Sequence, residues 1–267
     1  MALHAVVTGA NRGIGLEVAR GLLARSWQVT AVVRSEEAGQ AVTRALGPVR
    51  VVTGALDELA QVRRVGAALL DGPPISALVH NAGVWPAARV ITVDGVEQSF
   101  AVNHLAPFLL NHLLVAHLEK PARVVQVSAG LAVKGRVDLQ RTPRGDDFSA
   151  VRTYATTKLC NLMLTNRWVR WFEARGVTYA ALHPGVLRTG LGDRSGPLGW
   201  VLRLAKRSWR SPEEGAANVI RVATDASGPG VWFEEATQAP LPAIAADDAL
   251  ADALWRQAAT LCGIAAP

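Results

Sequence analysis

Short apolar segments alternate with helical segments along the whole chain, and this alternation constrains the fold more than any other feature. We expect strands at seven apolar segments, namely 5–7, 28–33, 49–53, 75–79, 124–127, 177–182 and 231–233. The stretches between them predict helices at 13–24, 57–70, 95–118, 152–175 and 212–224. Continuously apolar strands joined through helices are typical of a parallel sheet. We therefore predict one α/β domain over 1–267, a doubly wound (Rossmann) parallel sheet of about seven strands with helices on both faces.

The composition limits the partners of this chain. Only two cysteines occur, Cys160 and Cys262, which predicts free thiols in a reducing, cytoplasmic compartment. The net charge of +6 comes from scattered arginines, so we expect no nucleic-acid partner. The one local concentration of basic residues, at 203–210, suits a solvated helix face or an anionic group. Polar residues interrupt the apolar stretch 105–118, which predicts a core helix and no membrane span.

A glycine-rich turn lies between the first strand and the first helix. Its glycines permit a tight turn and a close approach to a pyrophosphate, which the N-terminus of the helix also attracts. The spacing is G-x-x-x-G-x-G, which differs from the general G-x-G-x-x-G motif. We predict that a dinucleotide binds here through Gly9, Asn11, Arg12, Gly13, Ile14 and Gly15.

Arg34 follows the second strand, where an acidic residue would bind the ribose 2′-hydroxyl of NAD. An arginine can instead pair with the 2′-phosphate of NADP, and Arg12 could close over the same phosphate. NADP(H) is therefore the predicted cofactor, unless Arg34 is a solvated residue beside Glu36. After the fourth strand, small residues would let the backbone run along the adenosine, at Asn81, Ala82 and Gly83.

Tyr154 and Lys158 lie four residues apart on a predicted helix, so they share one face. A neighbouring ammonium group favours the phenolate and would lower the pKa of Tyr154 from about 10. The phenol could then exchange a proton with a carbonyl or an alcohol. Ser128, at the end of the fifth strand, could hold the substrate oxygen. Asn103 could interrupt its helix and hold a water on a proton path to Lys158. Taken singly, each of these residues also suits a surface, capping or solvated position.

Together these motifs resemble the short-chain dehydrogenase/reductase family. The matching residues follow the family order over nearly the whole chain: Thr8-Gly9-x-x-x-Gly13-x-Gly15, Asn81-Ala82-Gly83, Asn103, Ser128, Tyr154-x-x-x-Lys158 and Pro184-Gly185. The resemblance implies a catalytic tetrad of Asn103, Ser128, Tyr154 and Lys158, in which Tyr154 and Lys158 also contact the cofactor. It implies that the nicotinamide lies against Pro184, Gly185, Val186 and Thr189.

The stretches 102–105, 134–138, 154–161 and 182–189 are similar to the retinol dehydrogenase-like branch of that family. The resemblance implies an NADP-dependent oxidoreductase that acts on a hydrophobic carbonyl or secondary alcohol. The tryptophan-rich segment at about 187–211 would be a substrate lid, with Trp85 as a further wall, although these tryptophans also suit packing of the lid onto the body. Helices at 95–118 and 152–175 pair subunits in many relatives, which favours a homodimer.

Two positions depart from the family pattern. His80 stands where asparagine is common, and Ala55 stands where an aspartate near the adenine is common. The predicted adenine contacts are therefore Leu56 and Asp57, with Asp57 acting from a shifted position or that contact missing. No metal site is predicted.

Two other functions remain open. A regulatory protein could bind NADP without catalysis, although it would not need Tyr154 beside Lys158. An epimerase or dehydratase would be longer and would space its glycines G-x-x-G-x-x-G, unlike this chain.

Overall fold

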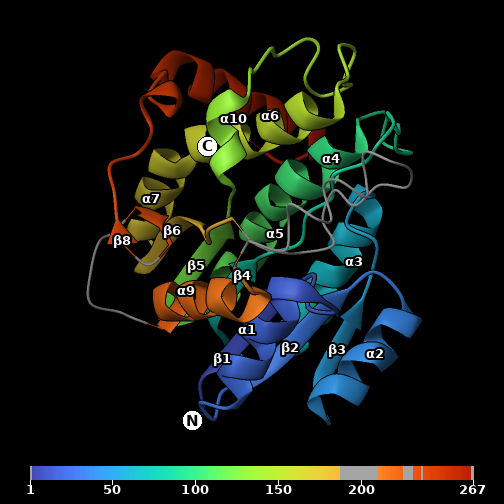
Figure 1. The fold of residues 1–267 in the computed structure, drawn as a ribbon, viewed down its shortest axis with the longest axis vertical. Helices are drawn as coiled ribbons and strands as arrows, with labels where there is room; N and C mark the ends of the chain where they lie inside the picture. Colours follow the sequence, from blue (N-terminus) through green and yellow to red (C-terminus); the bar gives the residue numbers. More distant parts are fainter. Residues whose placement is uncertain (1, 187–209, 225–230, 236, 266–267) are drawn as a thin grey trace.

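The computed structural model describes residues 2–186, 210–224, 231–235 and 237–265 (Figure 1). Their strands form one eight-stranded sheet in the order β3-β2-β1-β4-β5-β6-β7-β8. The strands are β1 (His4–Thr8), β2 (Gln28–Val33), β3 (Arg50–Thr53), β4 (Ile75–His80), β5 (Leu118–Val127), β6 (Val177–His183), β7 (Trp232–Glu234) and β8 (Thr237–Gln238). The first seven strands are parallel and β8 is antiparallel to β7, so the predicted sheet is confirmed with one short strand added.

Helices cover both faces of this sheet, as Figure 1 shows. One face carries α1 (Gly13–Leu23), α2 (Glu36–Leu46) and α9 (Pro212–Thr224). The other carries α3 (Leu59–Leu70), α5 (Ala106–Leu114), α6 (Ala150–Met163), α7 (Thr165–Glu173) and α10 (Asp248–Leu261). The chain moves outward from β1 to β3 and then, from β4 on, in the opposite direction. Ligands of such sheets bind where the order reverses, at the carboxyl ends of the strands.

The helices α2 and α10 were not predicted, although both carry recognisable start signals. The Ser35 side chain accepts a hydrogen bond from the backbone N–H of Ala38, and acidic residues fill the first turn of α2. The Asp247 side chain accepts in the same way from Leu250 at the start of α10. Capping residues with these spacings would have revealed both helices.

The predicted helix 95–118 is interrupted rather than continuous. It consists of α4 (Gln98–Phe100), a π-helical turn η1 (Ala101–Leu105), α5 and a 3₁₀ turn η2 (Val115–His117), after which Leu118 already begins β5. By length and composition the stretch Gln98–His117 could cross a membrane, but 78% of its most apolar window is buried inside the fold. It is packed here as a core helix.

Side chains along each central strand alternate between two hydrophobic cores, because successive residues of a strand point to opposite faces. In β1, Val6 packs toward α3 and α5, whereas Ala5 and Val7 pack toward α1 and α9. This burial on both faces explains why the strands are continuously apolar in sequence.

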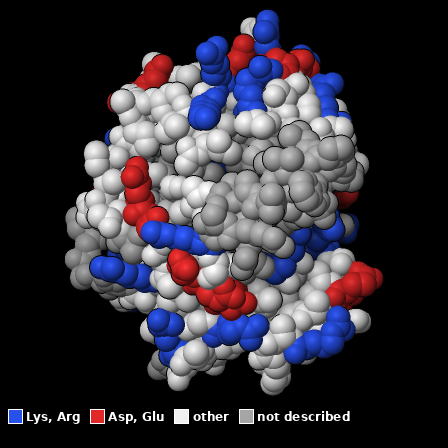
Figure 2. All heavy atoms as spheres, viewed as in Figure 1, with Lys and Arg blue, Asp and Glu red and all other residues white. Residues whose placement is uncertain are grey.

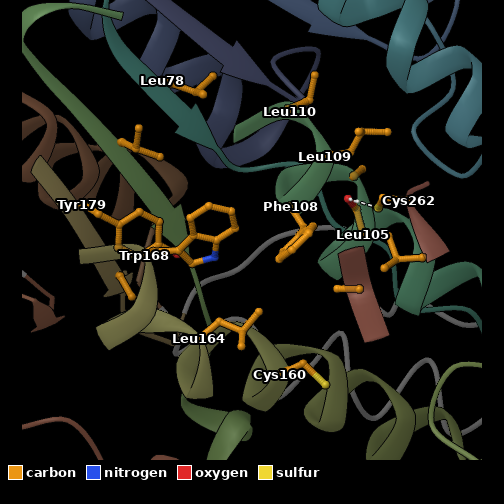
Figure 3. Packing of buried hydrophobic residues seen from close by; sticks show 14 of the residues in the cluster. Leu78, Leu105, Phe108, Leu109, Leu110, Cys160, Leu164, Trp168, Tyr179 and Cys262 are labelled. Atoms are coloured by element: carbon orange, nitrogen blue, oxygen red, sulfur yellow. Dashed lines mark hydrogen bonds between the residues drawn. The ribbon is translucent and has the colours of Figure 1, made fainter. Parts of the chain in front are cut away.

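An aromatic cluster joins three of the helices on the α5 face. Phe108 lies with its ring centroid 5.1 Å from Trp168 of α7 and 5.0 Å from Trp255 of α10. Figure 3 shows Phe108 and Trp168 side by side in this core, together with Tyr179 of β6. With 3% of its surface exposed, Trp168 belongs to the core. Arg167 of α7 links this helix to α10 through ion pairs with Asp248 and Asp252.

Acidic and basic side chains both occur on the face shown in Figure 2, around a largely uncharged area. Two acidic groups there lie directly beside basic ones rather than apart from them. Among the described residues on this face, the charges do not form a continuous basic stripe.

We expect Phe108→Ala to lower the free energy of unfolding by about 3–5 kcal/mol, because it leaves a cavity among rings that cannot collapse together. The measurement is urea denaturation followed by circular dichroism. Val93→Ala, at a side chain that is 80% exposed, is the control and changes stability by less than about 0.5 kcal/mol. Equal losses in both variants would contradict this account of the core.

Candidate active site

Residues at the carboxyl ends of β1, β2, β4, β5 and β6 line a cleft of about 1170 Å³. Most of the predicted site residues lie in its wall: Gly9, Asn11, Arg12, Gly13, Ile14, Arg34, Leu56, Asp57, Asn81, Ala82, Gly83, Ser128, Tyr154, Lys158, Pro184, Gly185 and Val186. Gly15 and Asn103 lie behind the wall and do not line it. Thr189 and positions 187–209 of the predicted lid fall outside the described residues.

The glycine turn has a conformation and a packing that other residues would disturb. Gly9 and Gly13 have φ angles of +67° and +56°, in the left-handed region. A Cβ atom on Gly15 would lie 2.4 Å from the carbonyl oxygen of Gly9. Gly9 and Gly13 therefore shape the rim of the cleft, and Gly15 supports the turn from behind.

Hydrogen bonds between Thr8 and Asn81 join the ends of β1 and β4. The Thr8 hydroxyl oxygen accepts from the backbone N–H groups of Asn81 and Ala82, both at 3.0 Å. In return, the Asn81 side-chain amide donates to the carbonyl oxygens of Thr8 at 2.9 Å and Gly9 at 3.3 Å. Asn81 thus fixes the glycine turn with its side chain, a role that the sequence pattern did not reveal.

Two exposed arginines stand on the rim of the cleft beside β2. The guanidinium groups of Arg12 and Arg34 form no ion pair or hydrogen bond with the part of the chain that the structure describes. Glu36, the neighbour that could have neutralised Arg34, instead accepts a hydrogen bond from the Thr53 hydroxyl at 2.8 Å. Both guanidinium groups are therefore available to an anion. On the opposite rim Asp57 accepts from the Gln98 side chain at 2.8 Å.

Tyr154 and Lys158 are both buried, on the face of α6 that meets the cleft. The Lys158 ammonium lies 5.9 Å from the centre of the Tyr154 ring and donates to the Val127 carbonyl oxygen at 2.9 Å. Burial lowers the pKa of Lys158 to about 8 and raises the pKa of Tyr154. The sequence predicted that Lys158 would lower the pKa of Tyr154, whereas burial raises it in this structure because desolvation disfavours the phenolate.

Asn103 lies in the π-helical turn η1, which agrees with the predicted break in the helix. Its side-chain amide accepts from the backbone N–H of Val84 at 2.8 Å and donates to the Val84 carbonyl at 3.0 Å. It also donates to the Thr157 hydroxyl at 3.0 Å, and its own carbonyl accepts from Asn161 at 2.7 Å. Asn103 therefore ties the segment after β4 to α6.

Ser128 follows β5 with its hydroxyl buried and without a hydrogen-bond partner among the described residues. Its backbone N–H donates to the Leu182 carbonyl at 2.7 Å, and two residues later Gly130 N–H donates to His183 Nδ1 at 3.1 Å. Burial lowers the pKa of His183, against the carboxylates of Glu234 and Glu235, which raise it. The sequence analysis missed His183, although it directly precedes the predicted Pro184-Gly185 turn.

Trp85 covers one face of Tyr154. The two rings are stacked, with centroids 4.7 Å apart and planes 9° apart. The predicted wall residue is thus in direct contact with the predicted proton donor. Among the described residues, no group of three or more His, Cys, Asp or Glu side chains could hold a metal ion.

His80 ends β4 in full burial, and its Nε2–H donates to the Asn111 side-chain oxygen at 2.8 Å. Burial lowers the pKa of His80 to about 4, and the Asn111 hydrogen bond opposes that shift. His80 is therefore neutral in the folded protein at pH values at which it is charged in the unfolded chain.

We expect His80→Asn to make folding less sensitive to acid. Below pH 6.5 the unfolded chain protonates His80 while the native site does not until about pH 4, so this histidine lowers stability as the pH falls through that window. The measurement is the free energy of unfolding from urea titrations at several pH values between 6.5 and 4. His104, whose pKa burial also lowers to about 4, keeps its contribution in the variant. An unchanged slope against pH would contradict this role of His80.

Comparison with known proteins finds relatives over most of this chain. Residues 3–197 match the family model described as short chain dehydrogenase. The chain is 36% identical to human dehydrogenase/reductase SDR family member 13, covering 97% of this chain and 73% of that protein. It is 30% identical to human retinol dehydrogenase 11, covering 97% and 85%.

Two solved structures extend this comparison. An uncharacterized protein from Mycobacterium paratuberculosis aligns with a TM-score of 0.79 and 29% identity, covering 99% of this chain and 95% of that one. A blue fluorescent protein from a metagenomic library, in complex with NADPH, aligns with a TM-score of 0.67 and 27% identity, covering 87% and 95%.

Proposed function

This chain belongs to the short-chain dehydrogenase/reductase family, as a retinol dehydrogenase-like oxidoreductase, and from that premise we propose its reaction. We propose that it transfers a hydride between NADP(H) and a hydrophobic carbonyl or secondary alcohol, with Tyr154 as the general acid and base. One observation carries the proposal: the phenol of Tyr154, buried beside Lys158, lines the same cleft as the unpartnered hydroxyl of Ser128 and the glycine turn.

The cleft fits a dinucleotide. Gly9 and Gly13 leave the backbone bare at the N-terminus of α1, where a diphosphate is attracted to free N–H groups. A Cβ atom on Gly83 would lie 3.6 Å from the Lys158 amine, so the glycine keeps open the space beside that amine. The proposed contacts to the far end of the cofactor are Pro184, Gly185 and Val186, with Thr189 outside the described residues.

NADP(H) is proposed rather than NAD(H) because of the two unpaired arginines on the rim. A 2′-phosphate would satisfy the guanidinium groups of Arg34 and Arg12 with charge-assisted hydrogen bonds. The relative solved in complex with NADPH is consistent with this choice. Leu56 and Asp57 remain the proposed adenine contacts, since both line the cleft.

The pKa values indicate the protonation states from which these residues would act. With a pKa of about 8, Lys158 is mostly an ammonium at neutral pH and can donate hydrogen bonds to a ribose. Burial raises the pKa of Tyr154, so the phenol carries a proton that it can give to a carbonyl oxygen while Ser128 holds that oxygen. When bound, NADPH would supply the hydride for this reduction. For oxidation Tyr154 would take the proton of the alcohol as a phenolate, a form that the positive charges of Lys158 and of the oxidised nicotinamide would favour.

Asn103 would act through other residues. Its side-chain amide hydrogen-bonds to Val84 and Thr157, and its backbone carbonyl oxygen accepts from the Asn161 side chain. A carbonyl oxygen has a second lone pair, so a water toward Lys158 stays compatible with this geometry. The proposed role of Asn103 is to position the segment after β4 against α6.

The surroundings of the reaction are also proposals. Apolar side chains of Trp85, Val102 and Leu131 line the cleft, which supports a hydrophobic substrate. The two cysteines are free thiols, which supports the predicted cytoplasmic location. A homodimer stays a prediction, and α10 already covers the aromatic side of α5 and α7. A regulatory protein that binds NADP without turnover remains the alternative.

We expect Tyr154→Phe to reduce turnover of ketones by at least about a hundredfold, because general acid catalysis is lost. NADPH binding, followed by the fluorescence of the reduced cofactor, survives. Tyr179→Phe is a matched control, since Tyr179 is the other tyrosine of the chain and is buried away from the cleft. If Tyr154→Phe kept most of its activity, the assignment of the proton donor would be wrong. NADPH binding without turnover of any ketone by the unmodified protein would favour the regulatory alternative.

We expect Arg34→Asp to shift the preference from NADP toward NAD by about tenfold or more, because an ion pair to the 2′-phosphate becomes a repulsion. The measurement is the ratio of kcat/KM values for NADPH and NADH. Arg44→Asp makes the same change of charge at an exposed position outside the cleft and leaves the ratio unchanged. A ratio unaltered by Arg34→Asp would remove Arg34 from the cofactor site.

A further inference from the structure

One asparagine, Asn103, hydrogen-bonds to the segments that carry both rings of the stacked Trp85–Tyr154 pair. The Asn103 side-chain amide accepts from the backbone N–H of Val84, the residue before Trp85, and donates to the Val84 carbonyl oxygen. The same amide donates to Thr157, which lies one turn after Tyr154 on α6. Because Asn103 hydrogen-bonds to Val84 beside Trp85 and to Thr157 on the helix of Tyr154, it fixes the backbone on both sides of the stacked rings. The indole therefore has a defined position on the phenol ring.

The indole N–H of Trp85 is a donor without an acceptor. It is shielded from solvent and has no hydrogen-bond partner among the described residues. Buried N–H groups are nearly always paired, because an unpaired one loses its hydrogen bonds to water without replacement. The Ser128 hydroxyl shares this condition, and both side chains line the cleft. The cleft therefore presents two unsatisfied polar groups within a largely apolar wall.

We propose that Trp85 determines substrate specificity by donating a hydrogen bond from Nε1 to a second oxygen of the substrate. The preferred substrates are then carbonyl compounds with a further acceptor nearby, as in a 1,2- or 1,3-dicarbonyl. This inference rests on the proposed function, in which Ser128 and Tyr154 hold the carbonyl that is reduced. That carbonyl carbon gains the hydride from NADPH and its oxygen gains the proton from Tyr154. The second carbonyl accepts the indole hydrogen bond and is not consumed.

A monoketone would leave the indole N–H unpaired in the complex. A site built to hydrogen-bond one substrate group rejects analogues that lack the group more strongly than it rejects changes in apolar size. Trp85 thus has two roles: the face of its indole contacts the proton donor Tyr154, and the N–H at its edge selects the substrate.

Steady-state kinetics with matched substrates tests the proposal. 1-Phenyl-1,2-propanedione is compared with its two monoketone analogues, propiophenone and phenylacetone, in the unmodified protein and in Trp85→Phe. The phenylalanine keeps an aromatic ring on Tyr154 but has no N–H. We expect the ratio of kcat/KM for the dione to that for the better monoketone to fall about tenfold in Trp85→Phe, a loss typical of one hydrogen bond. The intrinsic reactivity of the dione cancels in this comparison, and an unchanged ratio would overturn the proposal.

A binding measurement separates this inference from the proposed function. In ¹⁵N-labelled protein with NADP⁺, no reductant is present and the dione is not consumed. The indole N–H resonance of Trp85 is identified by its absence in Trp85→Phe. We expect it to move downfield when the dione is added and not when propiophenone is added. If the protein reduces ketones but this resonance ignores the dione, the inference fails alone. If no ketone is reduced, the proposed function fails and the resonance still decides whether Trp85 binds a dicarbonyl.

Discussion

The hydrogen bonds between Thr8 and Asn81 are the constraint on which the rest of the site depends. They join β1 to β4 at the point where the strand order reverses, and so they hold the two halves of the sheet in register at the edge where the cleft opens. The glycine turn is attached to one end of this link and the segment from Asn81 to Trp85 to the other. The cofactor half and the chemical half of the cleft are therefore placed relative to each other by a few polar atoms.

Burial, rather than charge attraction, sets the electrostatics of the chemical half. Tyr154 and Lys158 lie close together, but each is almost fully enclosed by protein, and desolvation moves both pKa values toward the neutral form. The electrostatics of the rim are different, because the guanidinium groups of Arg12 and Arg34 are exposed and form no ion pair with a described residue. The cleft thus changes from a solvated, positively charged entrance at β2 to a desolvated interior at α6.

The fold could be predicted from sequence to the extent that it follows from periodicity. All seven parallel strands were expected because burial on both faces makes them continuously apolar. The helices α2 and α10 were missed because their evidence lies in capping residues, Ser35 and Asp247, and not in long apolar runs. The site was predicted where several residues combine into one pattern along the chain, as for the glycine turn and the Tyr154–Lys158 pair.

Other features of the site depend on contacts between distant segments. The sequence could not show that the Asn103 amide hydrogen-bonds to Val84, that His183 accepts from Gly130, or that burial raises the pKa of Tyr154. Each of these depends on which segments the sheet brings together, and residue spacing carries no information on that.

The packing of α10 has a consequence for how the molecule is made. Trp255 of this helix completes the ring cluster around Phe108. Arg167 forms ion pairs with two carboxylates of the same helix, Asp248 and Asp252. A ribosome synthesises α10 after every strand of the sheet, so this side of the nascent chain stays open while the opposite side, formed by α1, α2 and α9, can already close. During translation the Phe108 and Trp168 rings therefore lack the cover of Trp255 until α10 emerges.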